Sequence, residues 1–390
     1  MFDLFGEQNK KGGMANAGTD RRRAGVGRYR EAARGLKDKI CKKLRGRPKM
    51  GQDRRAPMGE DGDAPIVVSM GMFIIDEIHF GDGRESVNDI IGGAGTYTVL
   101  GARVFLKGRD SRRAAFIVDV GSDFPQPVMD QLNQYNFGTV FRTDKSRLTT
   151  RGWNMYGDNE NRKFDYLTPK LRIEAEDITS DAFLSRSLSV HAICSPTRLI
   201  DIANGVDKTI IWEPVPTECN AENWDPCKQA LKRVEVFSPN AAEAAAFFGR
   251  PEPSSKEAIV SLATEFLSHM NQPHAVVAIR CGAMGSYIQS AAYSHWFPAY
   301  HTDSSKVKDP TGGGNCYLGG FAAGYILSGR RLDVAGIYAS VAASTAIEQI
   351  GLPELTMDGS RELFNGIETD DRIKQYCQAN GLDVPEGILH

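Results

Sequence analysis

The chain has 390 residues, of which 41% are hydrophobic and 25% charged, with a formal net charge of −2. Such a composition leaves enough apolar material for one large or two modest folded domains. The N-terminus lacks an apolar signal segment, and no run of about 18 uncharged apolar residues occurs, so we expect neither secretion nor a membrane span. Seven scattered cysteines without a C-x-x-C pair indicate reduced thiols and a cytoplasmic location, with the nucleus as an alternative.

The first part of the chain, residues 1–63, differs in composition from the rest. Residues 10–55 contain 17 Lys and Arg but four acidic residues, and large apolar side chains are few. A segment of this kind buries too little apolar surface to offset the entropy cost of ordering. We therefore expect a basic, mostly disordered extension ahead of a folded domain at residues 64–390.

Two features of the extension suggest partners. Apolar residues spaced by four predict a short basic amphipathic helix over Arg30–Leu44, which suits acidic membrane or nucleic acid. The tetrapeptide "RGRP", Arg45–Pro48, resembles the core of an AT-hook, which inserts arginines into a narrow minor groove. A nucleic-acid partner at residues 21–55 is thus one interpretation. A nuclear localisation signal and a plain solvated tail are the alternatives.

From Pro65 onward, short apolar runs alternate with helical patterns. The runs that predict buried strands are "PIVVSMGMFIID", "AAFIVDVG", "SVHAICSP", "KTIIWEPVP", "VEVFSPN" and "HAVVAIRCG". Helical patterns such as "NAAEAAAFFG" and Ser254–Met270 lie between several of them. This alternation predicts a parallel sheet covered by helices on both faces, with ligands bound at the carboxyl ends of the strands.

One segment alternates like a hairpin instead. Residues 148–167, "LTTRGWNMYGDNENRKFDYL", have polar and apolar residues in turn around a central polar stretch. A hairpin inserted between parallel units suits a lid over a site or a contact in a homodimer.

The stretch Asp309–Gly320, "DPTGGGNCYLGG", places three consecutive glycines before an apolar helix. Glycines at a helix start let N–H groups converge on an anion, and the helix dipole favours negative charge there. The pattern predicts a phosphate site; a glycine turn that serves tight packing alone is the alternative. A Lys after the glycines and a G-x-S-x-G sequence are both absent, which excludes a P-loop and a serine hydrolase.

Five motifs occur in a distinctive order along the chain: "GMFIID" (Gly71–Asp76), "IIGGAG" (Ile90–Gly95), "SPNAAE" (Ser238–Glu243), "AIRCGAMGSYI" (Ala278–Ile288) and "DPTGGGN". Together they resemble the PfkB family of ribokinase-like carbohydrate kinases, in a fungal branch with Asn in place of the catalytic Asp. The resemblance covers about Pro65–Pro353. It implies an α/β fold, a three-layer αβα sandwich with a mostly parallel central sheet and a small β lid.

The resemblance also implies roles at the phosphate end of the site. N–H groups of Gly312, Gly313 and Gly314 would stabilise charge on the transferring γ-phosphoryl group. Asn240 and Glu243 match an N-x-x-E motif that places Mg²⁺, although Asn240 also suits a plain helix N-cap. The remaining residues implied to bind ATP are Arg280, Gly282, Gly285, Asp309 and Thr311. In the family the position of Asp309 is associated with a monovalent cation, and a helix like residues 336–350 lines the adenine pocket.

At the acceptor end the resemblance implies that Asp76, Gly92, Gly93 and Tyr97 contact the substrate. Asp76 matches an acidic residue that holds acceptor hydroxyls. At Tyr97 the family commonly has Asn, so the contacts made by this position differ.

The second departure from the family is Asn315, where the family has the Asp that takes the acceptor proton. A neutral amide cannot act as that base, and general-base catalysis is typically worth about 10²–10⁴-fold. Asp303 and Asp309 are the nearby carboxylates that could replace this base, although the sequence does not place either within reach of a substrate. If only the base is missing, Asn315→Asp should raise the rate of phosphoryl transfer.

These features predict ATP- and Mg²⁺-dependent phosphoryl transfer, at a reduced rate, to a hydroxyl of a sugar-like or nucleoside-like small molecule. The alternative is a pseudokinase that binds nucleotide and acts through partners, with the basic extension as a targeting or nucleic-acid-binding arm.

Overall fold

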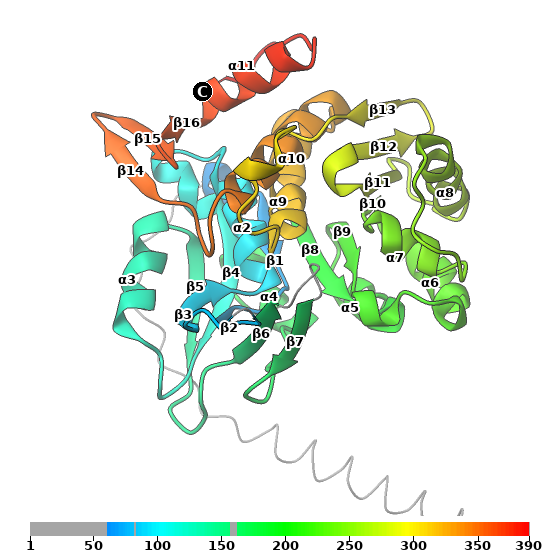
Figure 1. The fold of residues 1–390 in the computed structure, drawn as a ribbon. Coiled ribbons are helices and arrows are strands. Elements are labelled where there is room, and N and C mark those ends of the chain that lie inside the picture. The colour runs from blue at the N-terminus through cyan, green and yellow to red at the C-terminus, as the bar shows by residue number, and fades with distance from the viewer. Residues whose placement is uncertain (1–60, 82, 157–161, 390) are drawn as a thin grey trace, which may run out of the picture. The chain divides into compact units, whose positions relative to one another are not determined.

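We describe the protein from a computed structural model for residues 61–81, 83–156 and 162–389, and Figure 1 shows its fold. The basic extension, with its predicted helix and AT-hook-like tetrapeptide, lies outside these residues apart from Asp61–Asp63, which form a 3-10 turn. The central turn of the predicted hairpin, residues 157–161, also lies outside them.

A nine-stranded sheet forms the centre of the described domain, in the order β13-β12-β11-β10-β9-β8-β1-β4-β5. The seven strands from β11 to β5 in this order are parallel to their neighbours, and β12 and β13 add an antiparallel edge. The strands are β1 (Val67–Ser69), β4 (Ala114–Val120), β5 (Gly138–Thr143), β8 (Ser189–Cys194), β9 (Thr209–Pro214), β10 (Val236–Phe237), β11 (Val276–Arg280), β12 (Ser286–Ser290) and β13 (Ser294–Phe297). The predicted, mostly parallel sheet is confirmed.

A second sheet has four strands, in the order β3-β2-β6-β7. They are β2 (Ile74–Phe80), β3 (Val87–Gly92), β6 (Arg151–Tyr156) and β7 (Arg162–Tyr166). Strands β6 and β7 are antiparallel, which confirms the predicted hairpin, and β2 joins them through a parallel pairing with β6.

The prediction of one strand over "PIVVSMGMFIID" is wrong. The chain ends β1 at Ser69, crosses to the small sheet and begins β2 at Ile74. A Cβ on Gly71 in the crossing would lie 2.5 Å from the backbone nitrogen of Gly95, so this position needs glycine. Apolar residues are buried in both sheets, and therefore hydropathy alone does not mark the break.

Helices cover both faces of the large sheet, as Figure 1 shows. They are α2 (Ala94–Arg103), α3 (Gln126–Tyr135), α4 (Ala175–Thr179), α5 (Pro196–Gly205), α6 (Trp224–Leu231), α7 (Ala241–Ala246), α8 (Lys256–Ser268), α9 (Gly313–Leu327), α10 (Leu332–Ile347) and α11 (Thr369–Ala379). Alternate residues of β4 enter two different hydrophobic cores, Phe116 on one face and Ile117 on the other. Two cores separated by a sheet make the predicted three layers. No helix of the described residues is long and apolar enough to cross a membrane.

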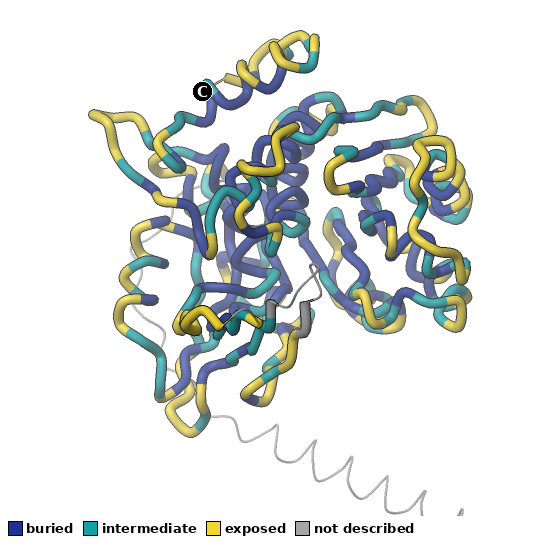
Figure 2. The backbone as a smooth tube through the Cα atoms, viewed as in Figure 1, coloured by how far each residue is buried: buried dark blue, intermediate teal, exposed yellow. Residues whose placement is uncertain are grey.

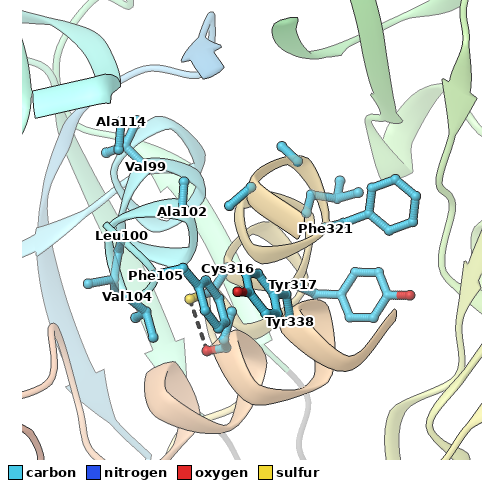
Figure 3. Close-up of a cluster of buried hydrophobic side chains, with 14 of the residues drawn as sticks. Val99, Leu100, Ala102, Val104, Phe105, Ala114, Cys316, Tyr317, Phe321 and Tyr338 are labelled. Carbon is cyan, nitrogen blue, oxygen red and sulfur yellow. Dashed lines mark hydrogen bonds between the residues drawn. The ribbon is translucent and has the colours of Figure 1, made fainter. Parts of the chain in front are cut away.

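Helices α2, α9 and α10 pack in direct backbone contact, and the tube in Figure 2 is dark blue, meaning buried, along them. A Cβ on Gly319 would lie 1.8 Å from the carbonyl oxygen of Thr98, and one on Gly320 would lie 2.6 Å from that of Tyr338. Figure 3 shows the contact between α9 and α10, where Cys316 Sγ donates to the carbonyl oxygen of Ala342 over 3.1 Å. Glycines therefore let α9 press close to its neighbours, and this fixes its N-terminus.

The chain ends in a three-stranded antiparallel sheet and α11. The strands are β14 (Leu355–Asp358), β15 (Arg361–Phe364) and β16 (Ile367–Glu368). Glu348, directly after α10, accepts from Arg372 of α11 over 2.7 and 2.8 Å and from Asn365 Nδ2 over 2.7 Å. This ion pair ties the terminal elements to the core.

Candidate active site

The predicted phosphate-binding turn leads directly into α9. Gly312 is the N-cap residue and has a φ of 76°, a left-handed conformation that favours glycine. A Cβ on Gly312 would lie 2.3 Å from the ring of Tyr97, so the backbone also approaches this ring too closely for any side chain. Asp309 stabilises the turn, since its Oδ1 accepts from the Thr311 N–H over 2.9 Å.

The N–H groups of the three glycines are not equivalent. The Gly313 N–H donates to the carbonyl oxygen of Pro310 over 3.2 Å, and Cys316 N–H donates to that of Gly312 over 2.8 Å. Gly314 and Asn315 lie between, in the first helical turn, where N–H groups have no intrahelical acceptor. The predicted anion hole therefore centres on Gly314 and Asn315, with Gly313 partly engaged in the turn itself.

Arg280 ends β11 and lies against this first turn. A Cβ on Gly314 would lie 2.1 Å from Arg280 Nη1, so glycine is what allows the guanidinium to approach. Nη1 pairs with Glu213 Oε1 at 2.7 Å, and Nη2 donates to Glu243 Oε2 at 3.3 Å and to the carbonyl oxygen of Ser238 at 3.2 Å. Burial opposes the charge, but the two carboxylates outweigh it and raise the pKa of Arg280.

Glu213, near the carboxyl end of β9, is 4% exposed and contacts Asn315. Its Oε2 accepts from Asn315 Nδ2 over 2.7 Å and lies 3.2 Å from His191 Nε2. Burial alone would raise the pKa of Glu213, but Arg280, His191 and Asn315 lower it below its usual value. The other ring nitrogen of His191 lies 3.0 Å from Ser69 Oγ. Glu213 is thus an ionised carboxylate with a partner on each side.

Asn240 and Glu243 form a capping box at the start of α7. Glu243 N–H donates to Asn240 Oδ1, while Asn240 donates from its N–H to Glu243 Oε2 and from Nδ2 to Oε1, each over 2.8 Å. The N-cap interpretation of Asn240 is confirmed. Burial is the main cause that raises the pKa of Glu243, with Arg280 opposing and Glu213 adding to it. The shorter contact of Arg280 to Glu213 explains why the two carboxylates shift in opposite directions.

Asp76 lies on β2 in the small sheet, 8% exposed. A Cβ on Gly92 would lie 1.8 Å from its Oδ2 and one on Gly152 would lie 2.7 Å from its Oδ1, so two backbones enclose the carboxyl group. Among the described residues, Oδ1 has no hydrogen-bond partner. Burial raises the pKa of Asp76 to about 7; a hydrogen bond from Asn154 lowers it and the charge of Asp309 raises it further.

Comparison with known proteins identifies the family to which this chain belongs. The model for the pfkB family of carbohydrate kinases matches residues 197–356. Protein MAK32 of Saccharomyces cerevisiae is 38% identical over 343 residues, which is 81% of this chain and 93% of MAK32. The chain belongs to the PfkB carbohydrate kinase family.

Solved structures agree at the level of the fold. Ribokinase from Giardia lamblia has a TM-score of 0.59 at 17% identity and covers 82% of this chain and 99% of its own. A putative ribokinase II from E. coli, in complex with ATP and Mg²⁺, has a TM-score of 0.58 at 16% identity and covers 81% and 99%. The protein therefore has the predicted ribokinase-like α/β fold with a small separate sheet.

The segment matched by the PfkB model contains most of the polar network just described. Glu213, Asn240, Arg280 and Asn315 all lie within residues 197–356, whereas Asp76 lies outside them. The Asn315–Glu213 pair therefore lies inside the segment that matches the PfkB model.

PfkB proteins imply Mg²⁺, and the residues present fit an ion held through water. Among the described residues no group of three or more His, Cys, Asp and Glu is arranged to hold a metal directly. Both oxygens of Glu243 already accept hydrogen bonds. Two buried carboxyl groups, Glu213 and Glu243, share the one guanidinium of Arg280. Such a pair of carboxyl groups suits a hydrated divalent cation, and Mg²⁺ usually keeps several waters.

The other predicted residues lie in turns and at helix starts. Gly282 and Gly285 have positive φ values of 54° and 87° in the turn between β11 and β12, directly after Arg280. The backbone N–H of Asp309 donates to the carbonyl oxygen of Ile347 over 3.2 Å, which joins the glycine turn to the end of α10. Gly93, with a φ of 89°, caps α2. Asp303 is exposed and bonds to Ser305.

The sequence motifs do not identify Glu213 or His191 as site residues. The structure places His191 fully buried beside Glu213. The available signal was the acidic residue at the end of the apolar run "TIIWEP", because parallel strands place their carboxyl ends at the ligand site.

Proposed function

We propose that the protein transfers a phosphoryl group from ATP, with Mg²⁺, to a hydroxyl of a sugar-like or nucleoside-like small molecule. The observation that carries the proposal is the contact between Gly314 and Arg280, where a Cβ would lie 2.1 Å from Nη1. A buried guanidinium and the N-terminus of a buried helix converge there, which suits the oxygens of a phosphoryl group.

The charge balance of the site supports a requirement for a divalent cation. Two carboxyl groups, Glu213 and Glu243, share the one guanidinium of Arg280, so little net positive charge is left for phosphate. Mg²⁺ would neutralise the phosphate oxygens when bound, as it does in phosphoryl transfer generally. The related ribokinase II structure, in complex with ATP and Mg²⁺, supports the same pair of ligands here.

Asp76 is the carboxylate best suited to accept the proton of the acceptor. A general base works best with a pKa near the operating pH, and the pKa of Asp76 is raised to about 7. Its buried Oδ1 has no hydrogen-bond partner among the described residues and is able to accept one from a hydroxyl. Glu213 is less suitable, since its pKa is lowered and both its oxygens are engaged.

The proposed step is a direct transfer. The acceptor hydroxyl gives its proton to Asp76, its oxygen forms a bond to the γ-phosphorus, and the bond from that phosphorus to the bridging oxygen of ADP breaks. Positioning and electrostatic stabilisation supply most of such a reaction, so a site without an acid at position 315 retains a reduced rate.

A second candidate function is nucleotide binding without transfer. Two observations favour it: Asn315 is a neutral amide held by Glu213, and the ring of Tyr97 packs against Gly312 where an acceptor would meet the glycine turn. In this case the protein would act through partners in its nucleotide-bound form.

Binding and turnover measurements on the natural full-length chain separate the two functions. We expect MgATP binding by calorimetry and ADP release that depends on one member of a panel of sugars and nucleosides. Binding without acceptor-dependent ADP release supports the second function. A chain that binds neither ATP nor ADP in the presence of Mg²⁺ contradicts both.

A further inference from the structure

The hydrogen bond between Asn315 and Glu213 fixes the orientation of the Asn315 amide. Glu213 is ionised by its pairing with Arg280, so it offers only acceptors. The group that faces Glu213 Oε2 at 2.7 Å must therefore be the Nδ2 of Asn315. Oδ1 then faces away from Glu213 and is the atom available to a hydroxyl of an acceptor.

The same contact determines what a carboxylate at position 315 would meet. Its oxygen would replace Nδ2 at about the same distance from Oε2, and two carboxylates about 3 Å apart do not both ionise. The charged and titratable groups around them are His191 of β8, Arg280 of β11 and Glu243 of α7. Arg280 already serves two carboxylates, and His191 already contacts Ser69 with its second nitrogen. In the absence of Mg²⁺, Arg280 is therefore the guanidinium on which all these carboxyl groups would depend.

We propose that Glu213 and position 315 share one negative charge, which in this protein resides on Glu213, and that Glu213 is a positioning residue for Asn315 and Arg280. Glu213 aims Oδ1 of Asn315 toward the acceptor and holds Arg280 against Gly314. The stability part of this inference is independent of any reaction, while its effect on turnover rests on the function proposed above.

A shared charge changes the activity expected of Asn315→Asp. A new carboxylate beside an ionised Glu213 takes up a proton, so it is no base at neutral pH and the single variant gains no activity. In the double variant Glu213→Gln with Asn315→Asp, the negative charge moves to position 315. The side-chain amide at position 213 then donates the hydrogen bond, and the carboxylate at position 315 accepts it. That double variant keeps one hydrogen bond and one charge, and only it carries an ionised carboxylate at the family position.

A double-mutant cycle on the full-length protein tests the pair. The unfolding equilibrium constant is measured by denaturant at pH 5 and pH 8 for the natural chain, both single variants and the double variant. We expect Asn315→Asp to raise this constant at pH 8 by about tenfold or more, with a smaller effect at pH 5 where the added proton is available. The double variant should recover most of that loss.

Asn365→Asp is a matched control. Asn365 Nδ2 donates to Glu348 Oε2 over 2.7 Å, and Glu348 pairs with Arg372 at 2.7 Å and His301 at 3.0 Å, so the same four residue types meet away from the glycine turn. Asn365→Asp should lower stability as Asn315→Asp does, with a smaller effect on MgATP affinity and turnover. Asn315→Asp should also weaken MgATP binding as pH rises, because ionisation at position 315 puts a second negative charge beside the phosphates.

Stability measurements test the shared charge, and turnover measurements test the proposed reaction. The shared charge is overturned if Asn315→Asp is as stable as the natural chain at pH 8. It is also overturned if Asn315→Asp and Glu213→Gln show no coupling. A gain in turnover by Asn315→Asp alone overturns it too. If Glu213→Gln does not fold, the pH dependence of Asn315→Asp still tests the shared charge. The shared charge requires that this variant lose more stability at pH 8 than at pH 5. No turnover by the natural chain contradicts the proposed reaction and leaves the stability test intact.

Discussion

The carboxyl group of Asp76 lies directly over the backbone of Gly92, so close that a Cβ on Gly92 would meet Oδ2 at 1.8 Å. Glycine at this position lets β3 cover an acid that remains partly without hydrogen bonds, since Oδ1 has no partner among the described residues. Burial of this kind disfavours the charged form and raises the pKa of Asp76 to about 7. The acceptor end of the site therefore holds its negative charge at an energetic cost.

Asp76→Asn should change how stability depends on pH. Between its ordinary pKa of 3.8 and about 7, Asp76 binds a proton in the folded protein and not in the unfolded one. The free energy of unfolding therefore falls as pH rises through this window, by up to about 4 kcal/mol. Asn does not titrate, so the stability of Asp76→Asn relative to the natural chain should increase from pH 4 to pH 8. Chemical denaturation across this range measures it.

The exposed Asp201 of α5 supplies the control for this experiment, because Asp201→Asn removes the same carboxylate from the surface of the domain. Where turnover is found, Asp76→Asn should abolish it without weakening MgATP binding. Equal pH profiles for Asp76→Asn and the natural chain contradict the raised pKa. Retention of turnover by Asp76→Asn contradicts its proposed role as base.

Gly314→Ala should weaken MgATP binding. The added methyl group would lie 2.1 Å from Arg280 Nη1 and displace a guanidinium that Glu213 and Glu243 hold. A hydrogen bond to a charged group is worth about 1.5–3 kcal/mol, so we expect the Kd to rise by roughly tenfold or more. Gly62→Ala is the matched control, since nothing lies within 4 Å of a Cβ there. Unchanged calorimetric affinity for Gly314→Ala argues against the phosphate site.

The sequence predicts the glycine turn before α9 and the start of α7 well because local rules determine them. Three consecutive glycines before an apolar helix require a turn that no other residue allows, and the structure places Gly312 at a φ of 76° as the N-cap of α9. Asn240 and Glu243, three residues apart, similarly define a helix start from their spacing alone.

The rest of the site depends on contacts between residues distant in sequence, which no local pattern encodes. Glu213 and Asn315 are 102 residues apart, and their pairing depends on the fold that brings the end of β9 to the start of α9. The break between β1 and β2 was missed for a similar reason, since each half of the apolar run is buried, but in a different sheet. Asp76 was identified as an acceptor residue through family resemblance, whereas its raised pKa emerged only from the burial by Gly92 and Gly152.

Replacement of Arg45 and Arg47 by Ala tests the AT-hook-like tetrapeptide. If these arginines contact phosphates, the double variant should bind duplex DNA and RNA more weakly and with a shallower dependence on salt, by about one unit of slope for each lost phosphate contact. Fluorescence anisotropy at several salt concentrations measures both quantities. Lys10→Ala with Lys11→Ala is the control, since it removes the same charge outside residues 21–55. An equal loss in both double variants indicates general charge attraction and contradicts a specific use of the tetrapeptide.

Tyr97→Asn should open the acceptor end beside the glycine turn. The Tyr97 ring is 4% exposed and packs so closely on Gly312 that a Cβ there would lie 2.3 Å from it. Removal of a buried ring costs about 3–5 kcal/mol of stability, so this variant needs to be assayed well below its Tm. We expect a broader range of accepted sugars and nucleosides in the ADP-release assay, with the Kd for MgATP unchanged because Arg280 and Gly314 are untouched. Tyr97→Phe keeps the ring and should retain the natural acceptor range. If both variants change acceptor use alike, the hydroxyl of Tyr97 and not the volume of its ring controls access to the site.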